Sequence, residues 1–293
     1  MGKSDGPSPV VQRRRLRGEL RRLRLETGET QDQVATAMQW SLSKLIRIEN
    51  GSVSISRSDL KVLLEHYGIV DDARIDELLA LGKAARERSW WSSYSDVAPQ
   101  RLLQFVEYEA AAMITRSFEP LLIPGLLQTE EYTREVIGKF DAHSPKDQMD
   151  ALVALRLKRQ ELLKQDGPPP WFFFILDESV VRRLVGGRDV MRGQIRHLIE
   201  LATRGNVTIE IVPFSAGISR GIQGPFVVFE FPDAEDDDVL YLESPRGDWN
   251  WISRDNPEEI VDYREIFEEL RGMSLGEEGS VEFLRGLLDE QVN

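Results

Sequence analysis

The chain has 293 residues, 41% of them apolar and 30% charged, with no cysteine and a formal net charge of −13. This length predicts two domains, and the lack of cysteine excludes disulfides, thiolate metal ligands and a cysteine nucleophile, which fits a cytoplasmic protein. No run approaches the roughly 20 apolar residues of a membrane helix, and the N-terminus lacks a signal-peptide pattern, so we expect no membrane segment.

The charge is unevenly distributed. Residues 1–68 hold twelve Lys/Arg and eight Asp/Glu, a balance of +4, so the remainder carries −17. A basic head on an acidic body is expected when only the head meets nucleic acid phosphate. We therefore expect the head, and not the body, to approach phosphate groups.

After a tail at 1–12 that we expect to be disordered, helical periodicity predicts four short helices within 13–68. Their predicted starts carry capping residues, namely Thr30 with Gln33, Ser41, and Ser56 with Asp59. Their predicted ends carry glycines, namely Gly28, Gly51 and Gly68. Two helices of about eight residues, joined by a tight turn between longer helices, form a helix-turn-helix, and a generic helical bundle is the alternative. Because this motif binds the major groove, we expect double-stranded DNA as a partner of the head, and a nucleoid-associated location.

The stretch 28–51 resembles the phage-repressor (Cro/repressor-like, XRE-type) family of helix-turn-helix proteins. The residues that carry this resemblance are Thr30, Gln31, Val34, Ala35, Ser41, Ser43 and the run Arg47, Ile48, Glu49, Asn50 and Gly51. Gln39 and Trp40 stand where the family often has glycine and a β-branched residue, so we expect a slightly altered turn.

The third helix begins at Ser41, and its first side chains are expected to point into the major groove. This geometry predicts four residues that read bases: Leu42, Ser43, Lys44 and Arg47. Arg47 or Lys44 would donate to guanine, and Leu42 would contact a thymine methyl group. A plain phosphate contact is the alternative for Lys44, and a solvated face is the alternative for many arginines of the first helix.

The resemblance to the repressor family implies further roles. Gln31, Ser41 and Asn50 match positions that hold phosphates, and Arg24 matches an arginine that forms a structural ion pair with Glu49. One head buries too little surface for high affinity, so we expect a homodimer on an inverted repeat with half-sites about 10 base pairs, or a multiple, apart.

Behind the head, the pattern predicts a helical linker at 71–97 and an α+β domain at 98–293 with one mixed sheet. Expected helices cover 101–112, 145–165, 190–204, 257–271 and 279–291, and one more is capped by Thr129. Expected strands cover 171–176 and 207–212, as a parallel right-handed pair, and 226–231, 239–243 and 249–253, as antiparallel strands. We interpret 114–125 as an extended apolar piece that turns at Pro124 and Gly125.

Segments of this body are similar to the C-terminal domain of actinobacterial WhiJ-like regulators. They are 124–132, the pair Asp177 and Glu178, and 190–194, 206–214 and 224–226. The resemblance implies a regulator of development and antibiotic production, with a small acidic partner protein in an antitoxin-like arrangement. A small-molecule sensor, or a DNA-targeted enzyme with an unrecognised active site, is the alternative.

Catalytic patterns are weak. His66, His143 and His197 are scattered, and His197 with Glu200 lacks a third metal ligand. The glycine-rich loop 217–224 lacks the Lys-Ser/Thr ending of a phosphate-binding loop, although Ser219 and Arg220 could touch a ligand. Asp177 is expected to cap a helix, and the acidic run 233–238 to be a solvated loop. We therefore expect no enzyme, no catalytic residues, no cofactor and no metal.

Overall fold

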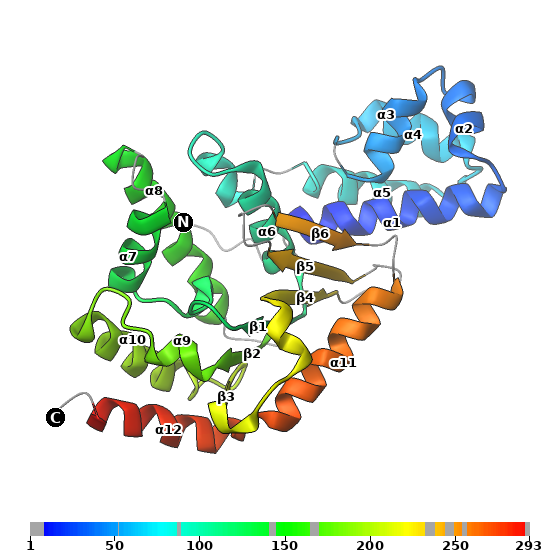
Figure 1. Ribbon diagram of the computed structural model, residues 1–293. Coiled ribbons are helices and arrows are strands. Elements are labelled where there is room, and N and C mark those ends of the chain that lie inside the picture. The colour runs from blue at the N-terminus through cyan, green and yellow to red at the C-terminus, as the bar shows by residue number, and fades with distance from the viewer. Residues whose placement is uncertain are drawn as a thin grey trace. The chain divides into compact units, whose positions relative to one another are not determined.

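The computed structural model of the chain describes residues 9–51, 53–86, 89–140, 145–164, 170–231, 238–243, 249–253 and 257–290 (Figure 1). The described residues fall into two compact units, one ending at Ser92 and the other starting at Ser93. Within the described ranges, no helix is both long and apolar enough to cross a membrane.

The first unit is all helical. Its helices are α1 (Pro9–Thr27), α2 (Gln31–Ala37), α3 (Leu42–Glu49), α4 (Arg57–His66) and α5 (Asp72–Ala84), and a short 3-10 turn, η1 (Trp90–Tyr94), follows. Helix α1 begins four residues before the expected start, and proline suits a first helical position because it needs no amide donor. Residues 9–12, which we expected in a disordered tail, are therefore helical, and residues 1–8 lie outside the described residues.

The expected starts of α2, α3 and α4 are confirmed. The Thr30 hydroxyl accepts from the Gln33 amide at 3.3 Å, and the Gln33 side chain accepts from the Thr30 amide at 2.8 Å. Ser41 and Ser56 cap α3 and α4 in the same way, by accepting from the backbone amide three residues later. Short local hydrogen bonds of this kind satisfy amides that the helix leaves unpaired, so the sequence alone determines where these helices start.

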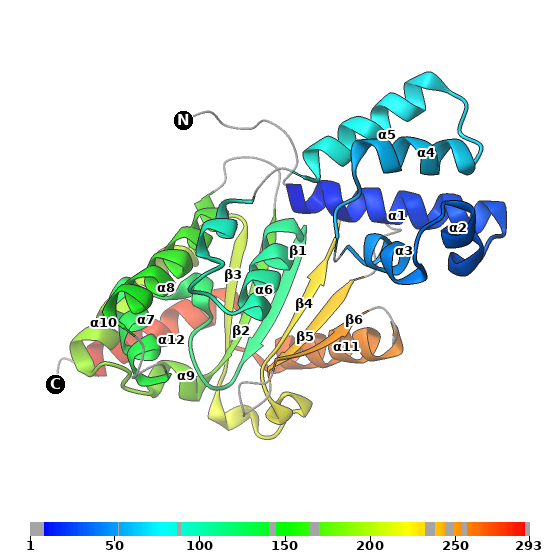
Figure 2. The ribbon, with the colours of Figure 1, turned by 90° about the horizontal axis from the view of Figure 1, so that it is seen from above.

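Leucines from four helices build the core of this unit. Its buried members include Leu16, Leu20, Leu23, Leu45, Leu60, Leu63, Leu64, Leu78 and Leu79. The last two come from α5, which lies along α1 and α4 (Figure 2), so this part of the expected linker packs as an integral helix of the first unit. Gly82 makes the close approach feasible, because a Cβ atom there would lie 2.7 Å from Leu60 Cδ2.

The second unit is built around a sheet. Its helices are α6 (Gln100–Ala111), α7 (Glu130–Phe140), α8 (Lys146–Arg159), α9 (Glu178–Arg182), α10 (Arg188–Leu201), α11 (Pro257–Met273) and α12 (Gly276–Glu290). Its strands are β1 (Ile114–Glu119), β2 (Trp171–Asp177), β3 (Val207–Val212), β4 (Phe226–Glu230), β5 (Val239–Glu243) and β6 (Trp249–Ser253). Short 3-10 turns occupy η2 (Gly125–Leu127), η3 (Gln160–Lys164), η4 (Phe214–Ala216) and η5 (Arg220–Gln223).

The strand order is β3-β2-β1-β4-β5-β6. Strand β2 pairs parallel with both β3 and β1, and β4, β5 and β6 continue the sheet antiparallel, as expected. The expected α+β class with one mixed sheet is confirmed. Strand β1 was not recognised as a strand in the sequence, yet it joins the parallel part of the sheet to the antiparallel part.

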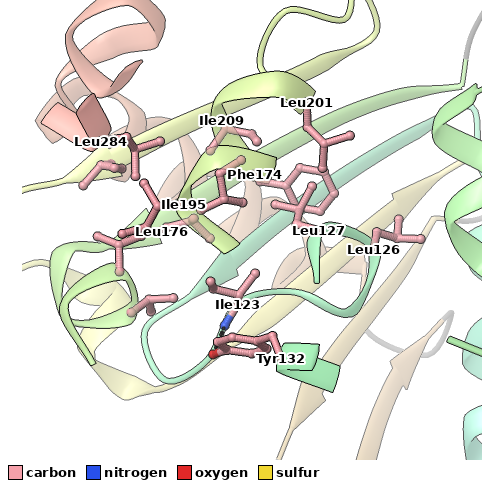
Figure 3. Close-up of a cluster of buried hydrophobic side chains, with 14 of the residues drawn as sticks. Ile123, Leu126, Leu127, Tyr132, Phe174, Leu176, Ile195, Leu201, Ile209 and Leu284 are labelled. Carbon is pink, nitrogen blue, oxygen red and sulfur yellow. Dashed lines mark hydrogen bonds between the residues drawn. The ribbon is translucent and has the colours of Figure 1, made fainter. Parts of the chain in front are cut away.

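Helices cover both faces of this sheet (Figure 2). Alternate residues of β2 face opposite ways, so Phe174 and Leu176 pack with Ile195 of α10 and Leu284 of α12 (Figure 3). The other face packs on α11 through Ile175 and its neighbours. From Phe172 to Leu176 the strand is apolar because it packs on both faces, which is typical of a parallel strand.

Candidate nucleic-acid interface

Helix α3 is anchored on one side and exposed on the other. Leu45 and Ile48 are buried in the core of the first unit, against a face of α2 that includes the small Ala35. Ser43 and Arg47, on the opposite side, are exposed, and the Leu42 side chain is 41% exposed. A rigidly held helix that presents its first two turns to solvent has the form of a recognition helix.

The turn between α2 and α3 contains a residue in the left-handed backbone conformation, and this residue is Gln39 where the repressor family often has glycine. Gln39 has a φ of 55°, the Gln39 amide donates to Thr36 O, and the Trp40 amide donates to Ala35 O at 2.8 Å. This pair of hydrogen bonds is a Schellman cap at the end of α2. Gln39 thus supplies the conformation that glycine provides at lower cost, and the unusual turn sequence still closes the motif.

Arg24 and Glu49 form a buried, two-pronged ion pair, as the repressor resemblance implied. Arg24 Nε lies 2.8 Å from Glu49 Oε1, and Arg24 Nη2 lies 3.1 Å from Glu49 Oε2. The hydrogen bonds with Glu49 raise the pKa of Arg24. Gln31 Nε2 also donates to Glu49, at 2.7 Å. The pair therefore joins the end of α1, the start of α2 and the end of α3.

Lys44, which we expected to read bases, is engaged within the unit. Its Nζ lies 3.0 Å from Asp59 Oδ2 and 3.9 Å from the centre of the Trp40 ring. Both charged side chains are about one-third exposed, at 39% and 34%, and ion pairs at such exposure contribute about 0–1 kcal/mol. Lys44 is therefore held beside the turn, by contacts weak enough for a phosphate to replace.

The three expected phosphate-contacting residues lie around the ends of α2 and α3. Ser41 caps α3, and its hydroxyl accepts from the Lys44 amide at 3.2 Å. Asn50 closes α3, with its side chain on the exposed surface and its carbonyl accepting from Arg17 Nη1. Gln31 is half-buried because it reaches Glu49. Ser41 and Asn50 are thus exposed residues, and Gln31 is half-buried and donates to the ion pair.

Ile46 is an exposed residue of α3 that the sequence reasoning missed. Its side chain is 38% exposed, and it follows Leu42 by one helical turn. The available signal was its spacing, because Ile46 falls outside the inward pair Leu45 and Ile48. The exposed surface of α3 therefore combines apolar, hydroxyl and guanidinium groups.

Most arginines of α1 serve the unit itself. Arg22 pairs with Glu19 at 3.0 Å and with Glu26 at 2.5 Å. Arg13 Nε donates to Ala85 O, which ties α1 to the end of α5. Arg15 and Arg21 are exposed. Only part of the basic charge of α1 is thus available to solvent, and the solvated face that the sequence raised as the alternative applies to Arg15 and Arg21.

The polar residues considered for chemistry in the second unit have structural contacts. The Asp177 side chain accepts from the Ser179 amide and caps α9, as expected. Glu178 Oε2 accepts from the Phe214 amide at 2.7 Å, which joins α9 to the turn after β3. Arg220, in the glycine-rich loop, pairs with Glu269 at 2.6 Å and lowers the pKa of that carboxyl.

The segment 124–132 is one of those similar to the C-terminal domain of WhiJ-like regulators, and it forms a buried hydrogen-bonded junction. Gln128 Nε2 donates to Ile123 O at 2.7 Å, and the Ile123 amide donates to the Tyr132 hydroxyl (Figure 3). Gln194 of α10 donates to Leu127 O and accepts from the Thr129 amide. These contacts assign the segment a role in folding.

The histidine pattern gives no metal centre in the described ranges, where no three His, Asp or Glu side chains cluster. Burial lowers the pKa of His197, which favours its neutral form. His143 and residues 233–237 of the acidic run lie outside the described residues.

Comparison with known proteins gives two family matches. Residues 15–78 match a helix-turn-helix domain, and residues 102–286 match a domain of unknown function (DUF5753). No curated protein matches the chain. No solved structure matches it either. The second match covers more than half of the sequence, so the chain belongs to the DUF5753 family, as a regulator with a DNA-binding helix-turn-helix domain.

Proposed function

We propose that the protein is a sequence-specific transcriptional regulator in which α3 reads the major groove of double-stranded DNA. The observation that carries this proposal is the division of α3 into a buried anchor, Leu45 and Ile48, and an exposed reading surface with Ser43 and Arg47. Arg47 has the donor geometry for guanine N7 and O6. Lys44, Ser41 and Asn50 would hold the flanking phosphates and fix the register.

The regulator would act as a homodimer on an inverted repeat. A single helix-turn-helix head buries little surface, and dimers of such heads bind half-sites about 10 base pairs, or a multiple of that, apart. The net charge of −17 behind the head supports an arrangement in which only the head approaches phosphate.

For the body we propose a role in receiving a small acidic partner protein, in an antitoxin-like arrangement in the cytoplasm and without catalysis. The proposal rests on the resemblance to actinobacterial WhiJ-like regulators. Glu178, Arg220 and Gln128 form hydrogen bonds or ion pairs within the second unit, which agrees with a non-enzymatic domain. Native mass spectrometry of the complex from its own cells should show a small acidic subunit, and a homodimer without one would contradict this role.

Selection from random-sequence DNA tests the DNA-reading proposal. The full chain is equilibrated with a pool of random duplexes at fixed salt, and the bound fraction is sequenced beside a pool treated without protein. We expect enrichment of two inverted half-sites at a constant spacing. Binding without enrichment of any sequence would contradict sequence-specific regulation, because phosphate contacts alone bind all sequences alike.

A further inference from the structure

Two apolar side chains stand exposed on α3, where a polar surface would be expected. Leu42 and Ile46 are 41% and 38% exposed and one helical turn apart. Around the helix they lie side by side, next to the exposed residues Asn50, Ser43 and Arg47. The apolar pair thus belongs to the same surface that the proposed function assigns to the major groove.

Among the groups that base pairs present in the major groove, the apolar one is the C5 methyl of thymine. An exposed leucine or isoleucine cannot donate or accept a hydrogen bond, so on this surface it can favour a base only by burying that methyl group. Because the two Cβ atoms are about 5–6 Å apart and successive base pairs are about 3.4 Å apart, the two methyl groups would lie one or two base pairs apart.

We infer that Leu42 and Ile46 form a thymine-reading pair, so that each half-site contains two thymines at adjacent or next-to-adjacent positions. This inference rests on the proposed function, since it requires that α3 enter the major groove. Arg47 and Ser43 read the neighbouring bases by hydrogen bonds, and the apolar pair adds specificity for A·T pairs.

Uracil substitution tests the pair without changing the protein. Uracil lacks only the thymine methyl group, so each contacted thymine of the selected site, when replaced by uracil, should weaken binding of the full chain about fourfold. Affinity is measured by fluorescence anisotropy at one salt concentration. Two such positions, one or two base pairs apart in each half-site, are expected.

Variants assign each methyl group to its residue. In Leu42→Ala the uracil penalty should disappear at one thymine, and in Ile46→Ala at the other, because the methyl group has lost its partner. Val62→Ala is the matched control, since Val62 is 52% exposed on α4, and it should leave both penalties unchanged. Far-ultraviolet circular dichroism checks that each variant is folded.

The outcomes separate this inference from the function on which it rests. If selection enriches a site but uracil substitution changes the affinity nowhere in it, the inference of a thymine-reading pair is wrong. The proposed function as a sequence-specific regulator is then still supported. That result would also leave contact with another protein as the explanation of the exposed pair. If no site is enriched, both the proposed function and the pair are wrong.

Discussion

Arg24, near the end of α1, holds Glu49, at the end of α3, by two nitrogen–oxygen contacts of 2.8 and 3.1 Å. Both side chains are buried, at 10% and 5% exposure, so each charged group has the other as a partner in place of water. Twenty-five residues apart in the chain, the two groups fix the recognition helix to the long first helix. The stability of this unit therefore depends on an ion pair in which either charge, if buried without the other, would cost much free energy.

Removing Arg24 should destabilise the first unit strongly. In Arg24→Ala the Glu49 carboxylate stays buried with Gln31 as its remaining donor among the contacts described, so we expect a loss of about 3–5 kcal/mol. Arg22→Ala is the matched control on the same helix, and it should cost at most about 1 kcal/mol because the Arg22 side chain is 37% exposed and Glu19 keeps Arg74 as a partner. Amide hydrogen exchange of α1–α4 measures both. Equal effects of the two variants would contradict the account.

Replacing Gln39 by glycine should stabilise the unit. Gln39 has a φ of 55°, a conformation that a residue with a Cβ adopts at a cost of about 1–3 kcal/mol. Part of this gain is offset by the greater freedom of glycine in the unfolded chain, so we expect a net gain of about 0.5–1 kcal/mol. Gly28→Ala is the converse control, since a Cβ there meets open space and only its φ of 72° opposes the change. It should lower the midpoint of thermal unfolding, whereas Gln39→Gly should raise it.

Tyr67→Phe should leave the first unit as stable as before or more stable. Tyr67 is only 7% exposed, and within the described part of the chain its hydroxyl has no hydrogen-bond partner. An unsatisfied buried hydroxyl costs about 1–3 kcal/mol, so its removal should recover up to about 1 kcal/mol. A clear loss of stability in urea unfolding would show that the hydroxyl has a partner after all.

The burial of Tyr67 also predicts that the stability of the first unit depends on pH. Burial, followed by repulsion from Glu49, raises the pKa of Tyr67 above its ordinary value of 10.0. The folded unit thus keeps the phenol protonated, while the unfolded chain releases the proton near pH 10. The stability linked to this proton is complete below pH 10 and is lost above it, by up to about 1.4 kcal/mol per pH unit. The advantage of Tyr67→Phe should therefore grow between pH 9 and 11, and a constant difference would contradict the burial of this group.

Asp59→Asn should strengthen DNA binding. The Asp59 carboxylate neutralises Lys44, and asparagine keeps the shape of the side chain while it removes the charge. We expect binding tighter by about 0.2–1 kcal/mol, with a dependence on salt steeper by up to about one unit of log–log slope. Asp72→Asn, in the first turn of α5, makes the same charge change as a control. Equal gains in the two variants would show that only net charge matters.

The starts of α2, α3 and α4 could be predicted because their signals are local. Thr30, Ser41 and Ser56 cap within three residues, so the sequence reveals these contacts directly. The contact between Lys44 and Asp59 spans fifteen residues and two helices, and no local pattern shows it. For the same reason α5 looked like a linker, since its burial depends on how it packs on α1.

In the second unit β2, β3, β4, β5 and β6 were predicted, and β1 was missed. Its sequence mixes Thr115, Arg116 and Ser117 with only a few apolar residues. Arg116 pairs with Glu230 of β4 at 2.7 Å, more than a hundred residues away. A strand stabilised by such distant contacts lacks the periodicity that marks its neighbours.

The most direct test of the central claim, that the exposed side of α3 reads DNA, is the affinity of Arg47→Ala for the selected site and for unrelated DNA at one salt concentration. Arg196→Ala, an exposed arginine of α10, carries the same charge change. We predict that Arg47→Ala loses about 1–3 kcal/mol for the selected site, keeps its weak binding to unrelated DNA and stays folded, while Arg196→Ala binds as the unchanged chain does. An Arg47→Ala protein that still binds the selected site with full affinity would contradict the account.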